Sequence, residues 1–488
     1  MDEYEYMADL RKFRHGIMGP STRKIVISIM FGLIFYIVAT NMLCPRNIEA
    51  KSLGAEECVE WMSSSEILDN NNLQHPQIKL NSERFLLPLL YNGPTNQIWG
   101  LRQAAYVAIL LNRTLVLPLF HKHILDESGP GTIIDASHRF QVDSLSRLMS
   151  VVTVDKYHQH CGKNVDVVLQ ATTPRDWTVE SLKQAEKELN LEFLQRSSKG
   201  IINRSGPFFP NIKVKAPFTA HADNSRIIRM AYKSDEKCAI YQFPFREIKM
   251  NVDHTPNQKE NIGDVHLFSE STDDISSRAL VNSLFQNMLP PKYIQEITET
   301  FLEHVFGGSP YLALHWRYDK EDFGKFMCNK EEGTGNQNQA EMCKKVNRIL
   351  PKSLGRAMTE YISYVNGKSK SDVRHIYIAT PKTQSTLHFL HDLTNELISK
   401  NLIVVTQVDL ESFVEKSELI TACSFLGENY NDFSALVEME ICTRSSVFLR
   451  SVYSSWSDNI VLNRDLANTD NALRRFDVAA LKLPVLVN

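Results

Sequence analysis

The fold is decided by residues 85–120, FLLPLLYNGPTNQIWGLRQAAYVAILLNRTLVLPLF. The first seven residues form an apolar run that is typical of a buried strand, and the run ends at the turn residues Asn92, Gly93 and Pro94. Residues 96–111 place apolar side chains at helical spacing, and residues 114–120 are typical of a second strand. A strand, turn, helix and strand in this order form a βαβ unit, which predicts a parallel sheet covered by helices.

A second alternation of helices and strands begins near residue 293. Between residues 120 and 280, in contrast, apolar runs and polar loops follow one another without a pattern that orders the elements. The sequence predicts an α/β protein built from two Rossmann-like, doubly wound domains that face a cleft, in the manner of a GT-B glycosyltransferase. The elements predicted in the second half are helix 293–306, strand 310–316, strand 375–380, helix 385–399, strand 401–408, helix 433–445 and strand 447–451.

A membrane anchor is predicted at residues 25–43, which run without a charge for about the length that crosses a bilayer. Basic residues are denser before this run than after it, so the N-terminus is expected in the cytosol and the rest in a lumen. A cleaved signal peptide is the alternative, although the run is longer than its usual apolar core. The predicted organisation is a cytosolic tail (1–24), an anchor (25–43), a stem (44–80), an N-terminal domain on the acceptor side (81–290) and a C-terminal domain on the donor side (291–488).

Composition narrows the function classes. Of 488 residues, 43% are hydrophobic and 23% charged, which is typical of a globular protein, and a formal net charge of −3 argues against bulk nucleic-acid binding. The eight cysteines contain no CxxC pair; in an oxidising lumen they suggest disulfides, among which Cys328 with Cys343 is one specific hypothesis. The sequence has no P-loop, no GxGxxG, no GxSxG, no HExxH and no DxD, so kinases, dehydrogenases, esterases and metal-dependent transferases lack their motifs.

Three strand ends carry polar residues where ligands bind in parallel sheets. Asn96 follows the turn at Gly93, so it either caps a helix or contacts a ligand. His315 and Arg317 come directly after the apolar run YLAL (311–314), where an arginine can hold a diphosphate or pair with a nearby carboxylate such as Asp319 or Asp322. Ser454 and Ser455 lie where a helix would begin, as caps or as phosphate ligands.

In this order, the three segments resemble the GDP-fucose protein O-fucosyltransferase family. The resemblance spans roughly residues 84–465, and its sharp blocks are GPTNQIWGLRQAAYVAILLNRTLVLPLF, YLALHWR and DFSALVEMEICTRSSVFLRSVYSSWSDNIV. It implies an inverting enzyme that uses GDP-fucose as donor and needs no metal or other cofactor. Arg317 would bind the β-phosphate and assist departure of GDP; the other donor-site residues implied are Gly93, Asn96, His315, Glu438, Ser454, Ser455 and Trp456.

The sequence departs from the family pattern at four positions. Trp316 replaces a smaller aliphatic residue, Glu438 replaces an aspartate, and Pro381 stands where an acidic residue is common. Gly93 takes the place of a glutamate that serves as the proposed base in one branch of the family. Asp319, Glu321 or Asp322, just beyond Arg317, is therefore the hypothetical base.

The resulting prediction is transfer of fucose from GDP-fucose to Ser/Thr hydroxyls of lumenal or secreted proteins, by a single-pass type II membrane protein of the ER or Golgi. Folded acceptors such as EGF-like or thrombospondin-type modules are expected. The alternatives are a transferase of the same fold that uses another nucleotide sugar, and an inactive relative that binds glycans or proteins.

Overall fold

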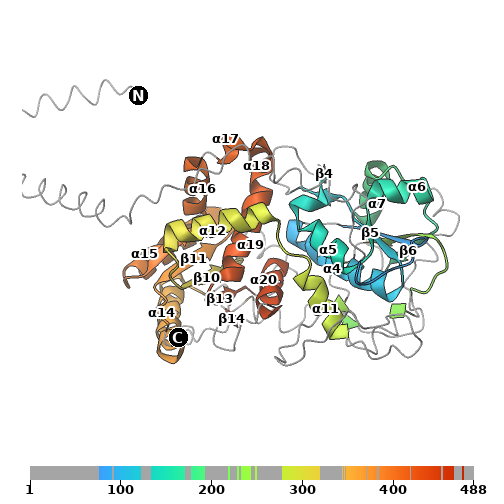
Figure 1. The fold of residues 1–488 in the computed structure, drawn as a ribbon. Helices are drawn as coiled ribbons and strands as arrows, with labels where there is room; N and C mark the ends of the chain where they lie inside the picture. Colours follow the sequence, from blue (N-terminus) through green and yellow to red (C-terminus); the bar gives the residue numbers. More distant parts are fainter. Residues whose placement is uncertain are drawn as a thin grey trace, which may run out of the picture. The chain divides into compact units, whose positions relative to one another are not determined.

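The protein is described by a computed structural model, and every described residue belongs to one compact unit, Leu53–Asn488 (Figure 1). The predicted anchor (25–43) and most of the predicted stem lie outside the described residues. None of the described helices combines the length and apolarity that a bilayer span needs. The structure describes residues 76–90, 93–122, 133–170, 177–192, 218–219, 228–229, 232–242, 244, 248–249, 277–318, 343, 346, 348–369, 371–381, 384–417, 419–451, 454–466 and 475–477.

The first half contains a parallel five-stranded sheet of order β5-β2-β1-β8-β6. Phe85 in β1 aligns with Thr114 in β2 and with Cys238 in β8, so β1 lies at the centre. The strands are β1 (Phe85–Leu89), β2 (Thr114–Val116), β5 (Val151–Val152), β6 (Val167–Gln170) and β8 (Cys238–Gln242); β3 (Phe120–His121) pairs with β4 (Ile133–Ile134), and β7 (Phe218–Thr219) with β9 (Ile248–Lys249). The helices are α4 (Pro94–Leu110), the 3-10 helix η3 (Ala136–His138), α5 (Val142–Leu148), α6 (Val154–Cys161) and α7 (Trp177–Glu188).

The second half contains another parallel five-stranded sheet, of order β12-β11-β10-β13-β14. Its strands are β10 (Tyr311–His315), β11 (His375–Ala379), β12 (Ile403–Thr406), β13 (Val447–Arg450) and β14 (Arg475–Asp477). The helices from residue 277 onward are α11 (Ser277–Gln286), α12 (Lys292–Phe306), α14 (Pro351–Ser369), α15 (Gln384–Ile398), α16 (Gln407–Lys416), α17 (Leu419–Ala422), α18 (Ser424–Glu428), α19 (Tyr430–Arg444) and α20 (Ser455–Leu466).

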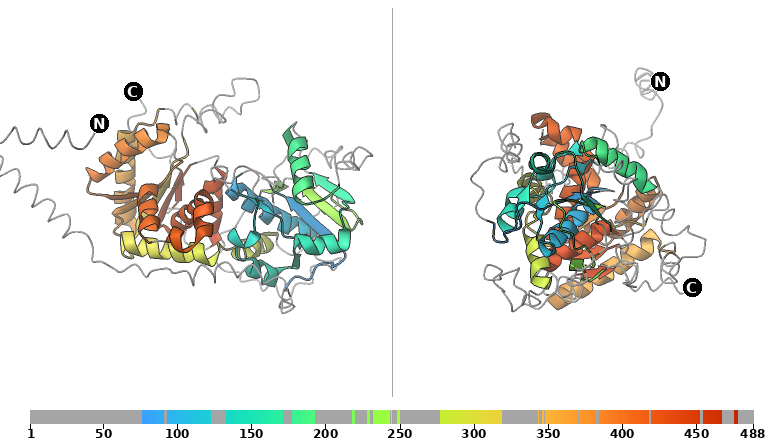
Figure 2. Two further views of the ribbon diagram at one scale, coloured as in Figure 1. Left: turned by 90° about the horizontal axis from the view of Figure 1, so that it is seen from above. Right: turned by 90° about the vertical axis from the view of Figure 1, so that its right-hand side faces the viewer.

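Helices pack on both faces of the second sheet, and alternate side chains of each strand point to opposite faces. Leu312 and Leu314 of β10 pack in a cluster with residues of α14 and α15, whereas Ala313 packs in a cluster with residues of α12, α16 and α19. Figure 2 shows helices on both sides of this sheet. Both faces of β10, β11 and β13 are therefore largely buried, which explains why their sequences are mostly apolar runs. The second half is doubly wound, as predicted.

One hydrophobic cluster joins the two halves. It contains residues of α4, α5 and α11 together with residues of α12, α19 and α20, so the core continues across the predicted boundary at residues 290–291. On the far face of the first sheet a separate cluster forms around Tyr157 and Cys161 of α6. A disulfide between Cys161 and Cys238 links α6 to β8. Cys343 is also disulfide-bonded, but Cys328, its hypothetical partner, lies outside the described residues.

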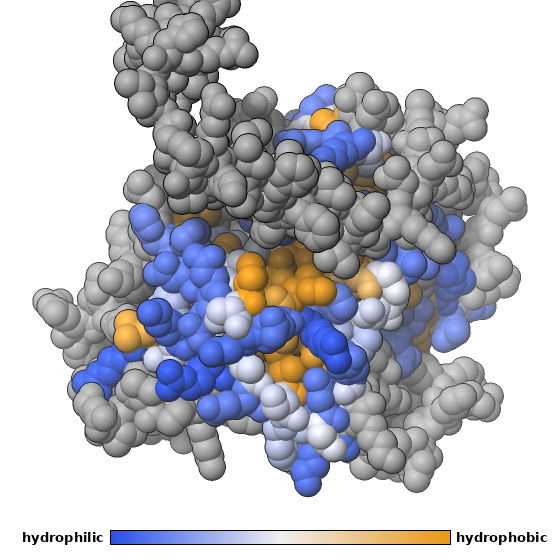
Figure 3. All heavy atoms as spheres, turned by 90° about the vertical axis from the view of Figure 1, so that its left-hand side faces the viewer, coloured by the Kyte–Doolittle hydropathy of each residue, from blue (hydrophilic) through white to orange (hydrophobic). Residues whose placement is uncertain are grey.

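An apolar surface accompanies α15 and the edge strand β12. Leu387, Ile398 and Ile403 each remain about half exposed. Figure 3 shows the side of the molecule on which α15 lies, where apolar residues gather between hydrophilic ones.

Most predicted elements are confirmed, although several boundaries differ. The predicted strand 114–120 is divided into β2, which ends at Val116, and β3, which starts at Phe120 and belongs to a different sheet. The predicted strand 401–408 ends at Thr406, because Thr406 and Asp409 form a capping box that starts α16. Of the two alternatives for Asn96, the helix cap is excluded: α4 begins at Pro94 with Gly93 as its N-cap, and Asn96 lies inside the first turn. Gly93 has a φ of −65°, which any residue adopts, so its turn does not require glycine.

Gly100, in the middle of α4, is the glycine that packing requires. A Cβ at this position would lie 2.6 Å from the backbone oxygen of Pro244. We expect Gly100→Ala to lower the free energy of unfolding by about 1–3 kcal/mol, because backbone has to move to relieve the overlap. Urea denaturation measures this. Gly93→Ala is the matched control, since nothing lies within 4 Å of its added Cβ, and an equal loss in both variants would contradict the packing argument.

Candidate functional site

The order of each sheet marks the place where a ligand is expected. In the first sheet the chain runs from β1 to β2 and β5 on one side, then crosses to the other side, where β6 forms the edge and β8 lies next to β1; in the second sheet it runs from β10 to β11 and β12 and then crosses to β13 on the other side of β10. Ligands of open α/β sheets bind outside the carboxyl ends of the strands at such switch points. The helices α4 and α20 begin just after β1 and β13, at these points.

The first turns of α4 and α20 lie side by side. Ser455 Oγ donates a hydrogen bond to Asn96 Oδ1, and Asn459 Nδ2 donates to the carbonyl oxygens of Thr95 (3.2 Å) and Ser455 (3.1 Å). Helix N-termini carry N–H groups without intrahelical partners and the positive end of the helix dipole. Pro94 has no N–H and the Asn96 N–H donates to the Gly93 carbonyl oxygen, so within residues 94–96 of α4 the N–H of Thr95 remains for a ligand. The positive ends of the two helix dipoles, one from each half of the chain, favour an anion in this region.

His315, the last residue of β10, is held against the start of α20. Its Nδ1 lies 2.7 Å from Ser457 Oγ, and its ring lies 4.2 Å, centroid to centroid, from the Trp456 ring. Burial, with a smaller contribution from the Arg317 charge, lowers the pKa of His315 to about 3. The imidazole is therefore neutral at physiological pH and can act as a hydrogen-bonding group without adding charge.

Ser451 joins the ends of the two neighbouring strands. Its hydroxyl donates to the His315 carbonyl oxygen (2.6 Å) and accepts from the Arg317 backbone N–H (3.1 Å), while its own N–H donates to Ser457 Oγ (3.2 Å). These bonds fix the backbone at Arg317, and Arg317 itself is half-buried. The position from which the arginine side chain leaves the sheet is thus determined by β13 as well as by β10.

Glu438 forms a buried hydrogen bond with another residue of the second half. It lies on α19, is 8% exposed, and its Oε1 accepts a hydrogen bond from Tyr377 Oη of β11 at 2.9 Å. Burial and the neighbouring Glu438 charge raise the pKa of Tyr377 well above 10, so this phenol stays protonated and donates. Glu438 therefore has a structural partner in Tyr377. Its contact with the nucleotide stays a prediction.

The structure brings four of the predicted residues together: Asn96, His315, Ser455 and Trp456. Ser454 accepts a bond from Ser457 N–H (3.5 Å), Gly93 precedes α4, and Arg317 follows β10. Asp319 and Asp322, the hypothetical bases, lie outside the described residues, as does Glu321. Sequence reasoning missed Arg102, Ser451, Ser457 and Asn459, although the last three flank the predicted serines within SVYSSWSDN.

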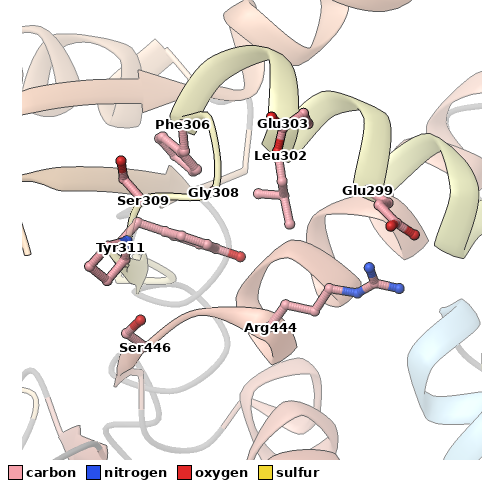
Figure 4. Close-up of a pocket in the computed structure, with 10 residues that line it drawn as sticks. Glu299, Leu302, Glu303, Phe306, Gly308, Ser309, Tyr311, Arg444 and Ser446 are labelled. Carbon is pink, nitrogen blue, oxygen red and sulfur yellow. The ribbon is translucent and has the colours of Figure 1, made fainter. Parts of the chain in front are cut away.

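A separate pocket lies at the opposite end of the second sheet (Figure 4). It has a volume of about 330 Å³, and its lining includes Tyr311 at the start of β10, Ser446 just before β13, Glu299 and Arg444. Figure 4 shows the Glu299 carboxylate and the Arg444 guanidinium on the same side of this pocket. Because it opens at the amino ends of the strands, it is distinct from the site at the carboxyl ends. Within the described part of the chain, no group of three or more His, Cys, Asp or Glu side chains is arranged to hold a metal ion.

Protonation of His315 is expected to destabilise the fold. The folded-state pKa of about 3 lies below the unfolded value near 6.5, so the unfolded state binds the proton first as pH falls. Between pH 6.5 and pH 4 the His315 contribution therefore lowers the free energy of unfolding by about 1.4 kcal/mol per pH unit. Urea denaturation across this range measures the slope, which His315→Gln should reduce. The control His391→Gln changes an exposed histidine, and the proposal of a neutral His315 fails if both variants keep the wild-type slope.

The two parallel sheets and the paired helix starts define a Rossmann-type α/β protein with an anion-favouring region at the sheet switch points. The profile of the family "GDP-fucose protein O-fucosyltransferase" matches residues 91–467. The chain belongs to this family of GDP-fucose-dependent protein O-fucosyltransferases.

Solved structures of fucosyltransferases resemble the chain at low identity. POFUT1 in complex with GDP-fucose is 15% identical, with 83% of this chain and 98% of that chain covered and a TM-score of 0.48. POFUT1 in complex with GDP is 14% identical, with 81% and 99% covered and a TM-score of 0.48. The fucosyltransferase NodZ from Bradyrhizobium is 13% identical, with 78% and 93% covered and a TM-score of 0.37. No curated protein matches the chain.

Proposed function

We propose that the protein transfers fucose from GDP-fucose to a Ser or Thr hydroxyl of a folded protein, with inversion at the sugar carbon and without a metal ion. Family membership supports the donor and the reaction class. The observation that carries the proposal is the hydrogen-bonded contact between the first turns of α4 and α20, beside the neutral His315 and next to the strand end that bears Arg317. This arrangement suits a diphosphate whose negative charge grows as it leaves.

In the proposed reaction the acceptor oxygen attacks the anomeric carbon of fucose as the bond from that carbon to the β-phosphate oxygen breaks. GDP leaves with the electron pair of the broken bond, and the hydroxyl proton passes to a base. Arg317 and the helix N-termini stabilise the departing diphosphate, and an acidic residue among Asp319, Glu321 and Asp322 accepts the proton. One displacement of this kind inverts the configuration at the sugar carbon.

The proposed independence from metal is tested directly with a chelator. Turnover that is unchanged in excess EDTA would support it, because the phosphate charge would then be met by protein groups alone. Activity that falls in EDTA and returns with Mg²⁺ or Mn²⁺ would reject it.

We propose that the catalytic part faces the lumen of the ER or Golgi, anchored by residues 25–43. The apolar run, the basic residues that precede it and the Cys161–Cys238 disulfide support this placement. A C-terminal tag on the full chain should resist protease in intact microsomes and be digested after detergent is added. Digestion before detergent would overturn the proposed orientation.

The activity is tested by GDP release from the purified full chain with GDP-fucose and a panel of folded acceptor modules, EGF-like and thrombospondin-type among them. Release that depends on both substrates, together with fucose on the acceptor, supports the proposal. Release from UDP-sugars alone would indicate a transferase with another donor. Binding of GDP-fucose without turnover on any acceptor would favour an inactive binding protein.

A further inference from the structure

Arg102 is a buried cation at the junction of α4 and α20. It lies in the interior of α4 and is 2% exposed. One terminal nitrogen donates to Asn459 Oδ1 at 2.6 Å, and the other donates to Asn463 Oδ1 at 3.0 Å. The guanidinium also lies over the Phe285 ring of α11, 4.1 Å from its centroid.

The hydrogen-bond partners of this guanidinium are neutral amides. Among the described residues, none of the ion pairs includes Arg102, and burial lowers the pKa of its guanidinium to about 9. A buried charge without a counter-ion disfavours folding, and apolar residues of similar volume often fill such a position with equal or greater stability. Stability therefore does not explain why an arginine stands here.

Asn459 connects Arg102 to the candidate site. The amide oxygen of Asn459 accepts from the guanidinium, and its amide nitrogen donates to the carbonyl oxygens of Thr95 and Ser455. Those two residues belong to the first turns of α4 and α20. A charged donor makes a stronger hydrogen bond than a neutral one and polarises the amide that receives it, which strengthens the bonds the amide donates.

We propose that Arg102 is a positioning residue for the diphosphate of the donor: it holds Asn459, and Asn459 holds the two helix N-termini side by side. The inference rests on the proposed function of this site for the nature of the ligand. Its structural part, the alignment of the two helix starts, does not depend on which nucleotide binds. Asn463 accepts from the same guanidinium without a described bond to either helix start, so it provides an internal control.

The first test is calorimetric binding of GDP to the full chain and its variants. Arg102→Met and Asn459→Ala should each weaken GDP binding about tenfold, and Arg102→Lys should recover part of the loss. Asn463→Ala should stay within about twofold of the wild type. A further control is Arg113→Met, because Arg113 is buried and bound to neutral carbonyl oxygens of Phe85, Lys237 and Ser234 near the amino end of β1. It should lower the melting temperature and leave the Kd for GDP unchanged.

The second test is hydrogen exchange without ligand. Arg102→Met should speed amide exchange in residues 95–97 and 455–459, while the sheet strands keep wild-type rates. Unchanged exchange there, or an unchanged Kd for GDP in Arg102→Met, would overturn the positioning role. If the wild type binds no GDP yet the exchange effect is present, the proposed donor is wrong and the positioning role of Arg102 stands.

Discussion

Replacing Arg317 with alanine is expected to lower kcat about a thousandfold, which is the scale seen when a group that stabilises a leaving phosphate is removed. The backbone at Arg317 is fixed by Ser451, so the side chain starts from a defined position at the switch point of the second sheet. The measurement is GDP release at saturating GDP-fucose and acceptor. Arg317→Lys should recover part of the activity, because it restores the charge but not the paired donors of a guanidinium.

The control for this prediction is Arg374→Ala. Arg374 is an exposed arginine that precedes β11, at the amino end of the sheet, and pairs with Asp372. Its loss should leave kcat within about twofold, since exposed ion pairs contribute little. If Arg317→Ala retained a tenth or more of the wild-type kcat, Arg317 would not be the main group that stabilises the charge of the departing diphosphate. The two helix N-termini would then be the anion-binding groups that remain among those described.

The second large effect is expected from the buried ion pair between Arg139 and Asp432. It joins residues next to η3 in the first half to α19 in the second, and both side chains are at most 2% exposed. The other terminal nitrogen of Arg139 donates to the His121 carbonyl oxygen at 2.7 Å. Asp432→Ala leaves a buried guanidinium without its carboxylate, so we expect the free energy of unfolding to fall by about 3–5 kcal/mol in urea denaturation.

Two further variants separate the ion pair from simple loss of packing. The double variant Arg139→Met/Asp432→Leu removes both charges and should recover much of the stability that Asp432→Ala loses. Asp143→Asn breaks an exposed pair with Arg147 and should change stability by less than about 1 kcal/mol. If the double variant were no more stable than Asp432→Ala, the unpaired charge would not be the cause of the loss.

The local pattern of the chain was sufficient to predict the strands and helices that frame the site. Residues 85–120 contain β1, α4 and β2 in order, and the polar positions after β1, β10 and β13 were recognised because ligands bind at the carboxyl ends of parallel strands. The helix start at Ser455 was also predicted correctly. These features are readable because strand and helix periodicities are local.

The central segment shows where local patterns stop. The strand β8 inserts between β1 and β6, and its five residues are all buried, yet nothing near Cys238 in the sequence indicates which strands it joins. The pairing of Cys161 with Cys238 could not be predicted from the sequence either, because eight cysteines allow many different pairings. Both depend on contacts between residues distant in the chain.

By itself, then, the sequence determined two α/β halves, three polar strand ends and a family resemblance, since each rests on residues that are neighbours along the chain. Only the tertiary structure decided that Asn96 contacts Ser455 instead of capping its helix, that His315 is neutral, and that Arg102 reaches the helix starts through Asn459. The physical reason is the same in each case. Hydrogen-bond partners and burial arise between segments that lie hundreds of residues apart, as Arg102 and Asn459 do with a separation of 357.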